Sequence, residues 1–306
     1  QKVMDETVTD FDEMRQAALD LGKQMGRLPE DAAKAMNLFA RQGKEQAEII
    51  SLTRVALMAT NIAEMTLNES VEMLTASVLQ WNLEASDAIR ILDAWNEVSN
   101  KNAVTASDLA EAFSHTSSMA KNLGLDIHEL NALVTILAAN TGKSGGEIGR
   151  SLRFALNRLT LPVAQSALRD ILGIDVFKDG TGELEDFSYI LREIGDRWDD
   201  LSDAQRNALA QAFGGNRHVQ DMQILFANLS TMGLKVATES MNSFGSAARE
   251  NARYMASLER RGQTLLASTK DLMVALGDSG ILPIMQTGLD LLTGAVNLIN
   301  AIPGPI

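Results

Sequence analysis

The sequence of 306 residues contains no cysteine and few aromatic residues. The absence of cysteine excludes disulfides, thiol nucleophiles and thiolate metal sites. Only three histidines are present, and the aromatic residues are nine Phe, three Trp and two Tyr. Large rings usually fill the core and line the pocket of an enzyme. Because few are present here, small apolar side chains and methionines must fill the core. These absences argue against an enzyme, and we expect no cofactor and no metal.

The chain also lacks a surplus of basic residues, since 27 Lys and Arg face 40 Asp and Glu for a net charge of -13. Proteins that bind nucleic acid by counterion release need the opposite balance, so we expect no specific nucleic acid partner. Residues 1–200 hold 32 acidic and 19 basic residues, a difference of -13, whereas residues 201–306 hold eight of each. An acidic N-terminal part and a neutral C-terminal part indicate that the two parts of the chain have different roles.

Proline is scarce as well, with five residues at positions 29, 162, 283, 303 and 305. Between them the apolar residues recur at helical spacing, as in Met4, Val8, Phe11 and Met14, which predicts an all-α fold. We expect a train of antiparallel amphipathic helices, with longer helices towards the C-terminus. The chain opens on Gln1 without an initiator Met or a signal-peptide pattern, which indicates a segment of a longer polypeptide.

Helix start and stop signals are most regular between residues 66 and 160. A Ser, Thr or Asp followed three residues later by an acid or an amide is the pattern of a helix N-cap. It occurs at Thr66–Glu69, Thr105–Asp108, Asp126–Glu129, Ser144–Glu147 and Ser202–Gln205. Gly124 and Gly142 each follow a predicted helix and suit the left-handed conformation that ends one. The structural turn residues that we predict are Gly124, Asp126, Gly142, Ser144, Gly146 and Gly180.

Residues 174–184 are the exception to helical spacing. Apolar and polar residues alternate on both sides of Asp179-Gly180, and an Asp-Gly pair between alternating segments favours a tight hairpin turn. We therefore expect one small β-hairpin near 174–184, with Gly180 in its turn.

One segment resembles part of a phosphate-binding loop, because Thr141–Gly146 contains Gly-Lys-Ser. The first glycine of that loop would fall at position 137, which is Leu137, and the segment follows a predicted helix rather than a strand. We interpret it as a turn between helices. The histidines His115, His128 and His218 have no His or Cys partner at metal-ligand spacing, so the sequence predicts no catalytic and no metal residues.

The last predicted helix, over 281–302, has an apolar face covering more than half of its circumference. At about 1.5 Å per residue it would span about 30 Å, the thickness of a bilayer core, although Asp290 and the absence of aromatic residues after Tyr254 disfavour a simple membrane span. Two interpretations stay open: a buried core helix, and a helix that packs against copies of itself and enters lipid when released. The residues predicted to face a copy or a membrane are Leu282, Met285, Leu289, Leu292, Val296 and Ile299.

These patterns divide the chain into four predicted parts. Residues 1–65 form N-terminal amphipathic helices, with helices ending near Gly26 and spanning about 30–41 and 44–65. Residues 66–160 form helical hairpins with glycine-punctuated turns, and 161–245 form a helical region containing the β-hairpin. Residues 246–306 are neutral apolar helices suited to oligomerisation or membrane contact.

Four motifs follow one another along the chain. They are Asn122-Leu123-Gly124-Leu125-Asp126 leading to Glu129-Leu130, the glycine-punctuated stretch from Asn140 to Arg153, Leu172–Val176 with Asp179-Gly180, and Leu209–Gly215. In this order and spacing they resemble the helical region of phage tail tape measure proteins, from about Leu28 to Leu161 and in less detail to residue 245. Thr141 stands just after Asn140, where that family usually has a glycine.

The resemblance implies a structural, non-enzymatic protein that sets the length of the tail tube during assembly and leaves ahead of the DNA during genome ejection into the host. It implies a place in the virion, in the lumen of the phage tail, and in the host cell envelope after ejection. The implied partners are copies of the chain in a homo-oligomer, expected to be a trimer, together with tail tube and tail tip proteins, tail assembly chaperones and the host membrane.

Two other functions stay open. The first is a helical-repeat adaptor or scaffold, because Trp81-Asn82-Leu83-Glu84 and Leu123-Gly124-Leu125-Asp126 are similar and lie 42 residues apart, as in repeated helical hairpins. The second is a membrane-inserting, pore-forming helical protein, based on the apolar stretch 265–302.

Overall fold

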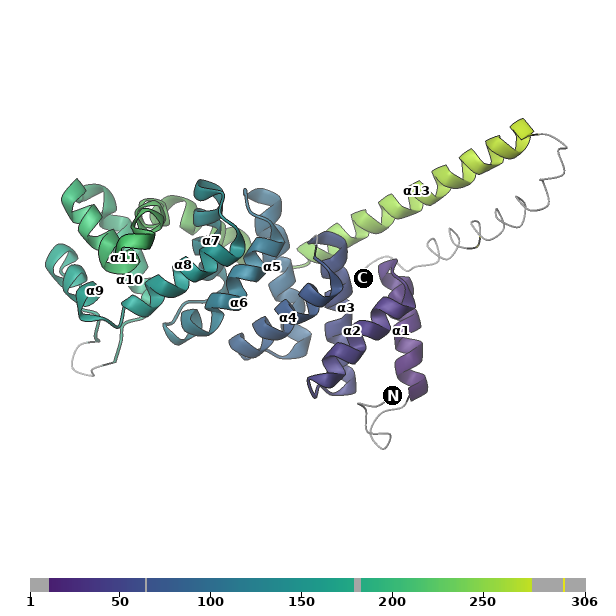
Figure 1. Cartoon of the computed structure of the whole chain (residues 1–306), viewed down its shortest axis with the longest axis horizontal. Coiled ribbons are helices and arrows are strands. Elements are labelled where there is room, and N and C mark those ends of the chain that lie inside the picture. The colour runs from purple at the N-terminus through teal and green to yellow at the C-terminus, as the bar shows by residue number, and fades with distance from the viewer. Residues whose placement is uncertain (1–10, 64, 179–182, 277–293, 295–306) are drawn as a thin grey trace. The chain divides into compact units, whose positions relative to one another are not determined.

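The computed structural model describes residues 11–63, 65–178, 183–276 and 294, and these residues are predominantly helical. The predicted all-α class is confirmed. The longest helix has 31 residues and lies towards the C-terminus, as expected. The α-helices are α1 Phe11–Met25, α2 Pro29–Arg41, α3 Gln46–Ile62, α4 Leu67–Trp81, α5 Ala88–Lys101, α6 Ala106–Asn122, α7 Ile127–Thr141, α8 Gly145–Arg158, α9 Pro162–Ala167, α10 Phe187–Arg197, α11 Asp203–Ala227, α12 Leu234–Met241 and α13 Ser246–Leu276 (Figure 1).

The chain divides into two compact units. Unit 1 comprises Gln1–Val71 and Ala247–Ile306, and unit 2 comprises Glu72–Ser246. The four-part division of the sequence stays a prediction.

Unit 1 is built on α1, α2 and α3, which pack against one another through small and medium apolar residues. A polar contact joins their ends to the beginning of α13. The Asn61 side-chain amide donates to the backbone carbonyl of Met25 at 2.9 Å and to the side-chain oxygen of Asn251 at 2.8 Å. Because these groups are largely shielded from water, their hydrogen bonds hold the first turns of α13 against the ends of α1 and α3. Fully buried core residues include Leu21, Ala32, Phe39 and Leu52.

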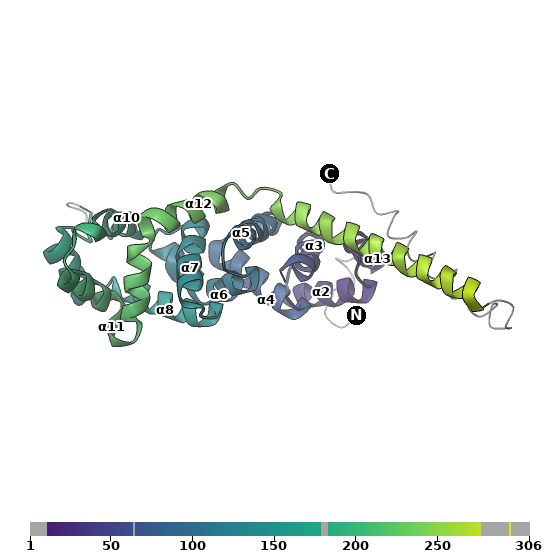
Figure 2. The same ribbon diagram turned by 90° about the horizontal axis from the view of Figure 1, so that it is seen from above.

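Unit 2 contains a helical layer in which α6 packs against α8 and α7 touches both (Figure 1). Figure 2 shows α12 lying across α5 and α7. The scarce aromatic residues are concentrated in this core. Trp95 and Phe113 pack edge to face with ring centres 5.5 Å apart, and Phe213 and Phe226 do the same at 5.5 Å. Such pairs stabilise a core beyond the area that they bury.

A common turn ends α2, α4 and α6. Each ends in a left-handed residue, Gly43 (φ 76°), Asn82 (φ 52°) and Gly124 (φ 82°). In each, the following backbone N–H donates five residues back, as in a Schellman motif. The bonds are Lys44 to Phe39 at 3.4 Å, Leu83 to Val78 at 2.9 Å and Leu125 to Ala120 at 3.0 Å. Gly26 (φ 62°) ends α1 in the same way, with the Arg27 N–H donating to the Gly22 carbonyl at 2.9 Å. The turn that the sequence indicated twice therefore occurs four times, and its last three occurrences lie 39 (82 − 43) and 42 (124 − 82) residues apart.

The predicted β-hairpin near 174–184 is wrong. The described residues of this stretch contain no strand and one isolated antiparallel bridge, between Phe177 and Leu184. Ile174 and Val176 are buried, so the alternation in the sequence reflects the burial of these two side chains. A two-stranded ribbon without a third strand is only marginally stable in water. Burial of Ile174 and Val176 holds this segment in place instead. Gly180 lies outside the described residues.

Candidate functional site

The turn from α7 to α8 carries the glycine motif that the sequence singled out. Gly142 has a φ of 65° and ends α7 in the left-handed conformation. Ser144 then caps α8: its hydroxyl accepts from the Glu147 backbone N–H at 3.4 Å, and the Glu147 carboxylate accepts from the Ser144 N–H at 3.2 Å. The Gly-Lys-Ser sequence thus forms a turn between two helices, as predicted.

Two glycines of this motif bring α8 into backbone contact with α6. A Cβ atom on Gly145 would overlap the Asp108 carbonyl oxygen and lie 2.6 Å from the Asp108 Cα, and one on Gly149 would lie 3.0 Å from the Ala112 Cα. The Gly145 N–H donates to the Asp108 carboxylate at 2.8 Å. Asp108 therefore caps the start of α8 as well as lying in the first turn of α6.

A buried polar cluster joins the same turn to α11. Asp221 is only 3% exposed, and its carboxylate accepts from the Lys143 ammonium, from the Ser151 hydroxyl at 2.8 Å and from the His218 ring at 3.4 Å. Burial by itself would raise the pKa of Asp221. The hydrogen bonds from Lys143 and Ser151 and the positive charge of Lys143 outweigh it and hold the pKa below its usual value.

The geometry of this cluster suits a clamp between helices rather than catalysis. Ser151 and His218 both contact Asp221, whereas nucleophilic catalysis requires the serine hydroxyl to reach the imidazole. Lys143 holds the glycine-rich turn against α11. Within the described ranges, no three His, Asp or Glu side chains come together as they would around a metal ion.

The second predicted turn, after α6, joins α6, α7 and α10. Gly124 occupies the left-handed region, and the Asp126 carboxylate accepts from the Glu129 N–H at 2.7 Å while Glu129 accepts from the Asp126 N–H at 2.9 Å. The carbonyl of Leu123 accepts from the Phe187 N–H at the start of α10, at 2.7 Å. Burial raises the pKa of Glu129 despite its backbone hydrogen bond. The side chains of Asp126 and Glu129 therefore stabilise this turn by capping the start of α7.

Replacing the cap of α7 measures how much this turn contributes. We expect Asp126→Ala to lower the free energy of unfolding by about 1 kcal/mol, because a cap hydrogen bond is lost and the Glu129 N–H is left without its acceptor. Asp126→Ser keeps an acceptor oxygen and should recover most of the stability. Urea unfolding followed by circular dichroism measures both, and equal losses for the two variants would contradict a capping role.

Other predicted residues fall outside the described part of the chain. They are Leu282, Met285, Leu289, Leu292, Val296 and Ile299, together with Gly180. Gly146 lies in the first turn of α8, where a Cβ would meet the flexible ends of the Glu111 and Arg150 side chains. None of the helices in the described ranges combines the length and the apolar character needed to cross a membrane.

Sequence reasoning missed three residues of the joint around α8. Asp221 carries no recognisable motif, because the partners that bond it most closely, Ser151 and Lys143, are 70 and 78 residues away along the chain. Gly145 and Gly149 are four residues apart, a spacing that places them on one face of a helix and permits close approach to a neighbour. That spacing was the available signal.

Every polar cluster described above joins one helix to another, which defines an all-α protein whose helices are held together by polar contacts as well as by apolar packing. The sequence profile of the phage-related minor tail proteins matches residues 15–214. The chain belongs to this family, so the tape measure resemblance seen in its four motifs is confirmed and the chain is a phage tail protein.

Two named relatives are similar over much of this chain. The tape measure protein of Pneumococcus phage Dp-1 is 26% identical over 257 residues, which cover 83% of this chain and 22% of the relative. The probable tape measure protein of Escherichia phage P2 is 27% identical over 183 residues, covering 59% of this chain and 22% of the relative. The chain thus spans about a fifth of the length of these relatives. No solved structure matches it.

Proposed function

We propose that this chain is a segment of a tape measure protein that sets the length of the tail tube during assembly and leaves ahead of the DNA during ejection. The observation that carries the proposal is the similarity to a protein named tape measure over 83% of the chain. The helical content supports it, because an α-helix extends by a fixed increment of about 1.5 Å per residue and so converts sequence length into physical length.

The proposed setting is the lumen of the virion tail, and the host cell envelope after ejection. The partners would be further copies in a homo-oligomer, proposed as a trimer, with tail tube and tail tip proteins and the assembly chaperones. The net charge of -13 supports a chain that does not adhere to the DNA that follows it. The apolar residues from Leu282 to Ile299 are proposed to mediate contact between copies or with the host membrane.

A length series in the parent phage tests this proposal. Residues 262–275 of α13 provide a block of 14 helical residues that can be deleted, or duplicated once, twice or three times. We expect the mean tail length in electron micrographs to change by about 1.5 Å per residue added or removed, with steps set by the height of a tube ring.

The control replaces the same 14 residues by a different helix-forming sequence of equal length, which should leave the tail unchanged. Tails of one length across the whole series, from viable and fully assembled particles, would overturn the proposal.

The recurring turn after α2, α4 and α6 favours a second candidate, a helical-repeat scaffold that offers a surface to one partner. Turns of equal geometry at intervals of about 40 residues are typical of stacked helical hairpins. The two candidates differ in solution. A compact monomer in small-angle X-ray scattering, with tail length independent of the series above, would favour the scaffold.

A further inference from the structure

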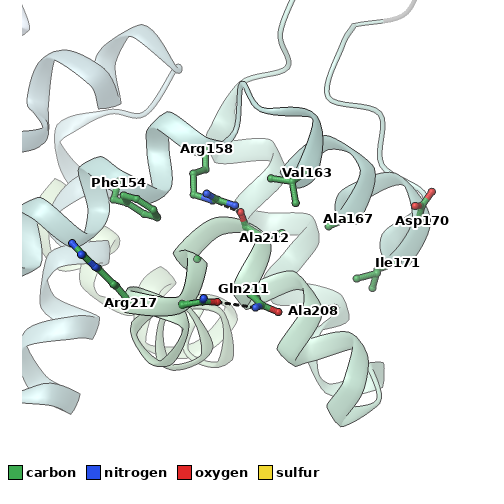
Figure 3. A pocket seen from close by; sticks show the side chains of 12 residues that line it. Phe154, Arg158, Val163, Ala167, Asp170, Ile171, Ala208, Gln211, Ala212 and Arg217 are labelled. Carbon is green, nitrogen blue, oxygen red and sulfur yellow. Dashed lines mark hydrogen bonds between the residues drawn. The ribbon is translucent and has the colours of Figure 1, made fainter.

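An open pocket lies in unit 2 between α8, α9 and α11 (Figure 3). Its volume is about 830 Å³, which is within the range of sites that bury a ligand. Its wall is mostly apolar, and two of the apolar residues that line it are unusually exposed, Phe154 at 38% and Val163 at 48%. Exposed apolar side chains beside a concave surface indicate a place where another molecule packs.

Two arginines border one side of this pocket. Arg158 donates from Nε to the Ala212 carbonyl at 2.6 Å and lies 5.5 Å from the centre of the Phe154 ring. These contacts hold its guanidinium in place while other N–H groups remain available. In Figure 3 the side chain of Arg217 points towards the Phe154 side of the pocket, and Asp170 lies on the opposite side.

The shape of α11 keeps this side of the pocket open. Gly215 adopts φ 56° and ψ −159°, a conformation that residues other than glycine rarely adopt, and α11 bends there. A Cβ on Gly215 would already touch the Phe154 ring at 3.4 Å. The bend therefore brings the backbone of α11 close to the Phe154 ring and to Arg158.

The charge around the pocket is opposite to that of the chain as a whole. Of the charged residues that line it, Arg158 and Arg217 are basic and Asp170 is acidic, although the chain carries a net charge of -13. In the part of the chain that the structure describes, Arg217 has no carboxylate within ion-pair distance. The ligand that fits is a helix with an apolar stripe and carboxylates beside it, and with a basic group towards Asp170.

The chain itself contains such a sequence at residues 2–11. Met4, Val8 and Phe11 follow helical spacing, and Asp5 and Asp10 would flank that stripe on either side. Lys2 precedes the acids. With the acids beside the arginines, Lys2 would lie towards Asp170, on the opposite side of the pocket.

We propose that residues 2–11 of a second copy of the chain dock into this pocket, with the apolar stripe of Met4, Val8 and Phe11 against Phe154 and Val163 and the carboxylates against Arg158 and Arg217. A basic surface with an exposed ring also suits single-stranded nucleic acid. The apolar wall and the acidic chain favour the peptide. This contact between copies goes beyond the proposed length-setting role and does not depend on it.

The test measures binding of a fluorescent peptide of residues 1–14 to the full chain by anisotropy. We expect Arg217→Ala to weaken binding about fivefold, as an exposed ion pair contributes about 1 kcal/mol. Ala208→Trp, which fills the pocket, should abolish binding, whereas Ala204→Trp, one turn earlier on the exposed side of α11, should not. Arg90→Ala is the control for general loss of positive charge.

A peptide that carries Asp5→Asn, Glu6→Gln and Asp10→Asn tests the charge pairing. This peptide should bind the unmodified chain and the Arg217→Ala chain equally weakly. Without its carboxylates it forms no ion pair that Arg217→Ala could remove. Sedimentation of the full chain should show self-association that both Arg217→Ala and removal of residues 1–10 weaken.

Three results would overturn the proposal. The first is equal binding of a scrambled peptide. The second is self-association that neither change affects. The third is tighter binding of a 14-nucleotide oligo-dT than of the peptide at physiological salt, which would assign the pocket to single-stranded nucleic acid.

Discussion

Gly145→Ala is expected to lower the free energy of unfolding of unit 2 by about 3 kcal/mol or more. The added methyl group would overlap the Asp108 carbonyl oxygen and lie 2.6 Å from its Cα and 2.7 Å from its carbonyl carbon. These are backbone atoms of a helix, so they cannot rotate away as the end of a side chain can. Either α8 moves away from α6 or the first turn of α8 unwinds.

Both outcomes disturb more than one contact. If α8 moves, the 2.8 Å hydrogen bond from the Gly145 N–H to the Asp108 carboxylate is lost, together with the packing of Gly149 on Ala112. If the first turn unwinds, the capping box of Ser144 is lost instead. The gain in helix propensity from glycine to alanine is at most about 1 kcal/mol and is too small to offset either change.

The neighbouring glycine provides a matched control. A Cβ on Gly146 would meet the end of the Glu111 side chain, which can rotate into solvent. Gly146→Ala should therefore change the free energy of unfolding by no more than about 1 kcal/mol, in the direction of greater stability if helix propensity dominates. Denaturant unfolding of both variants measures the difference. Equal stabilities would contradict a backbone contact between α6 and α8.

The sequence was sufficient to predict elements whose signals are local. Thr105 accepts from the Asp108 N–H at 3.0 Å and the Thr66 hydroxyl accepts from the Glu69 N–H at 3.3 Å, as their spacing predicts. A cap involves residues three apart, and so its pattern is visible without the fold. Apolar spacing is also local, and α2 and α3 begin and end within a few residues of their predicted bounds.

Features that depend on distant residues could not be predicted in this way. Asp108 looks like a helix cap in the sequence, but nothing in its neighbourhood shows that it also binds the Gly145 N–H, 37 residues away. The wrong hairpin near 174–184 has a related origin. Alternation of apolar residues reports which side chains are buried, and it does not distinguish burial against another strand from burial under helices.

Asp221→Asn is expected to lower the free energy of unfolding by about 2 kcal/mol at neutral pH. Asparagine has the same shape, but its single carbonyl oxygen replaces two carboxylate oxygens, and its NH₂ group would face the donors Lys143 or Ser151. The Ser151 hydroxyl is 1% exposed and has no route to water. The loss is smaller than for a fully buried ion pair, because the side chain of Lys143 is 39% exposed and can be solvated.

The pH dependence of stability separates the charge of Asp221 from its shape. The pKa of Asp221 is lower in the folded chain than its usual value, so the unfolded state binds the proton more readily. Its contribution is therefore fully present above the unfolded value of about 4 and is lost as the pH falls through the lower folded pKa. The unmodified chain should lose its advantage over Asp221→Asn progressively below about pH 4.

Two further variants decide whether the ion pair with Lys143 causes this effect. Lys143→Met removes the cation that lowers the pKa of Asp221, so in this background Asp221→Asn should cost less and the difference between acidic and neutral pH should shrink. Ser151→Ala removes one neutral hydrogen bond and should leave most of that difference. Thermal unfolding from pH 3 to pH 7 measures the unmodified chain, the three single variants and the two double variants that combine Asp221→Asn with Lys143→Met or Ser151→Ala. If Asp221→Asn matched the unmodified chain across this range, the glycine-rich turn would be held to α11 by apolar packing alone.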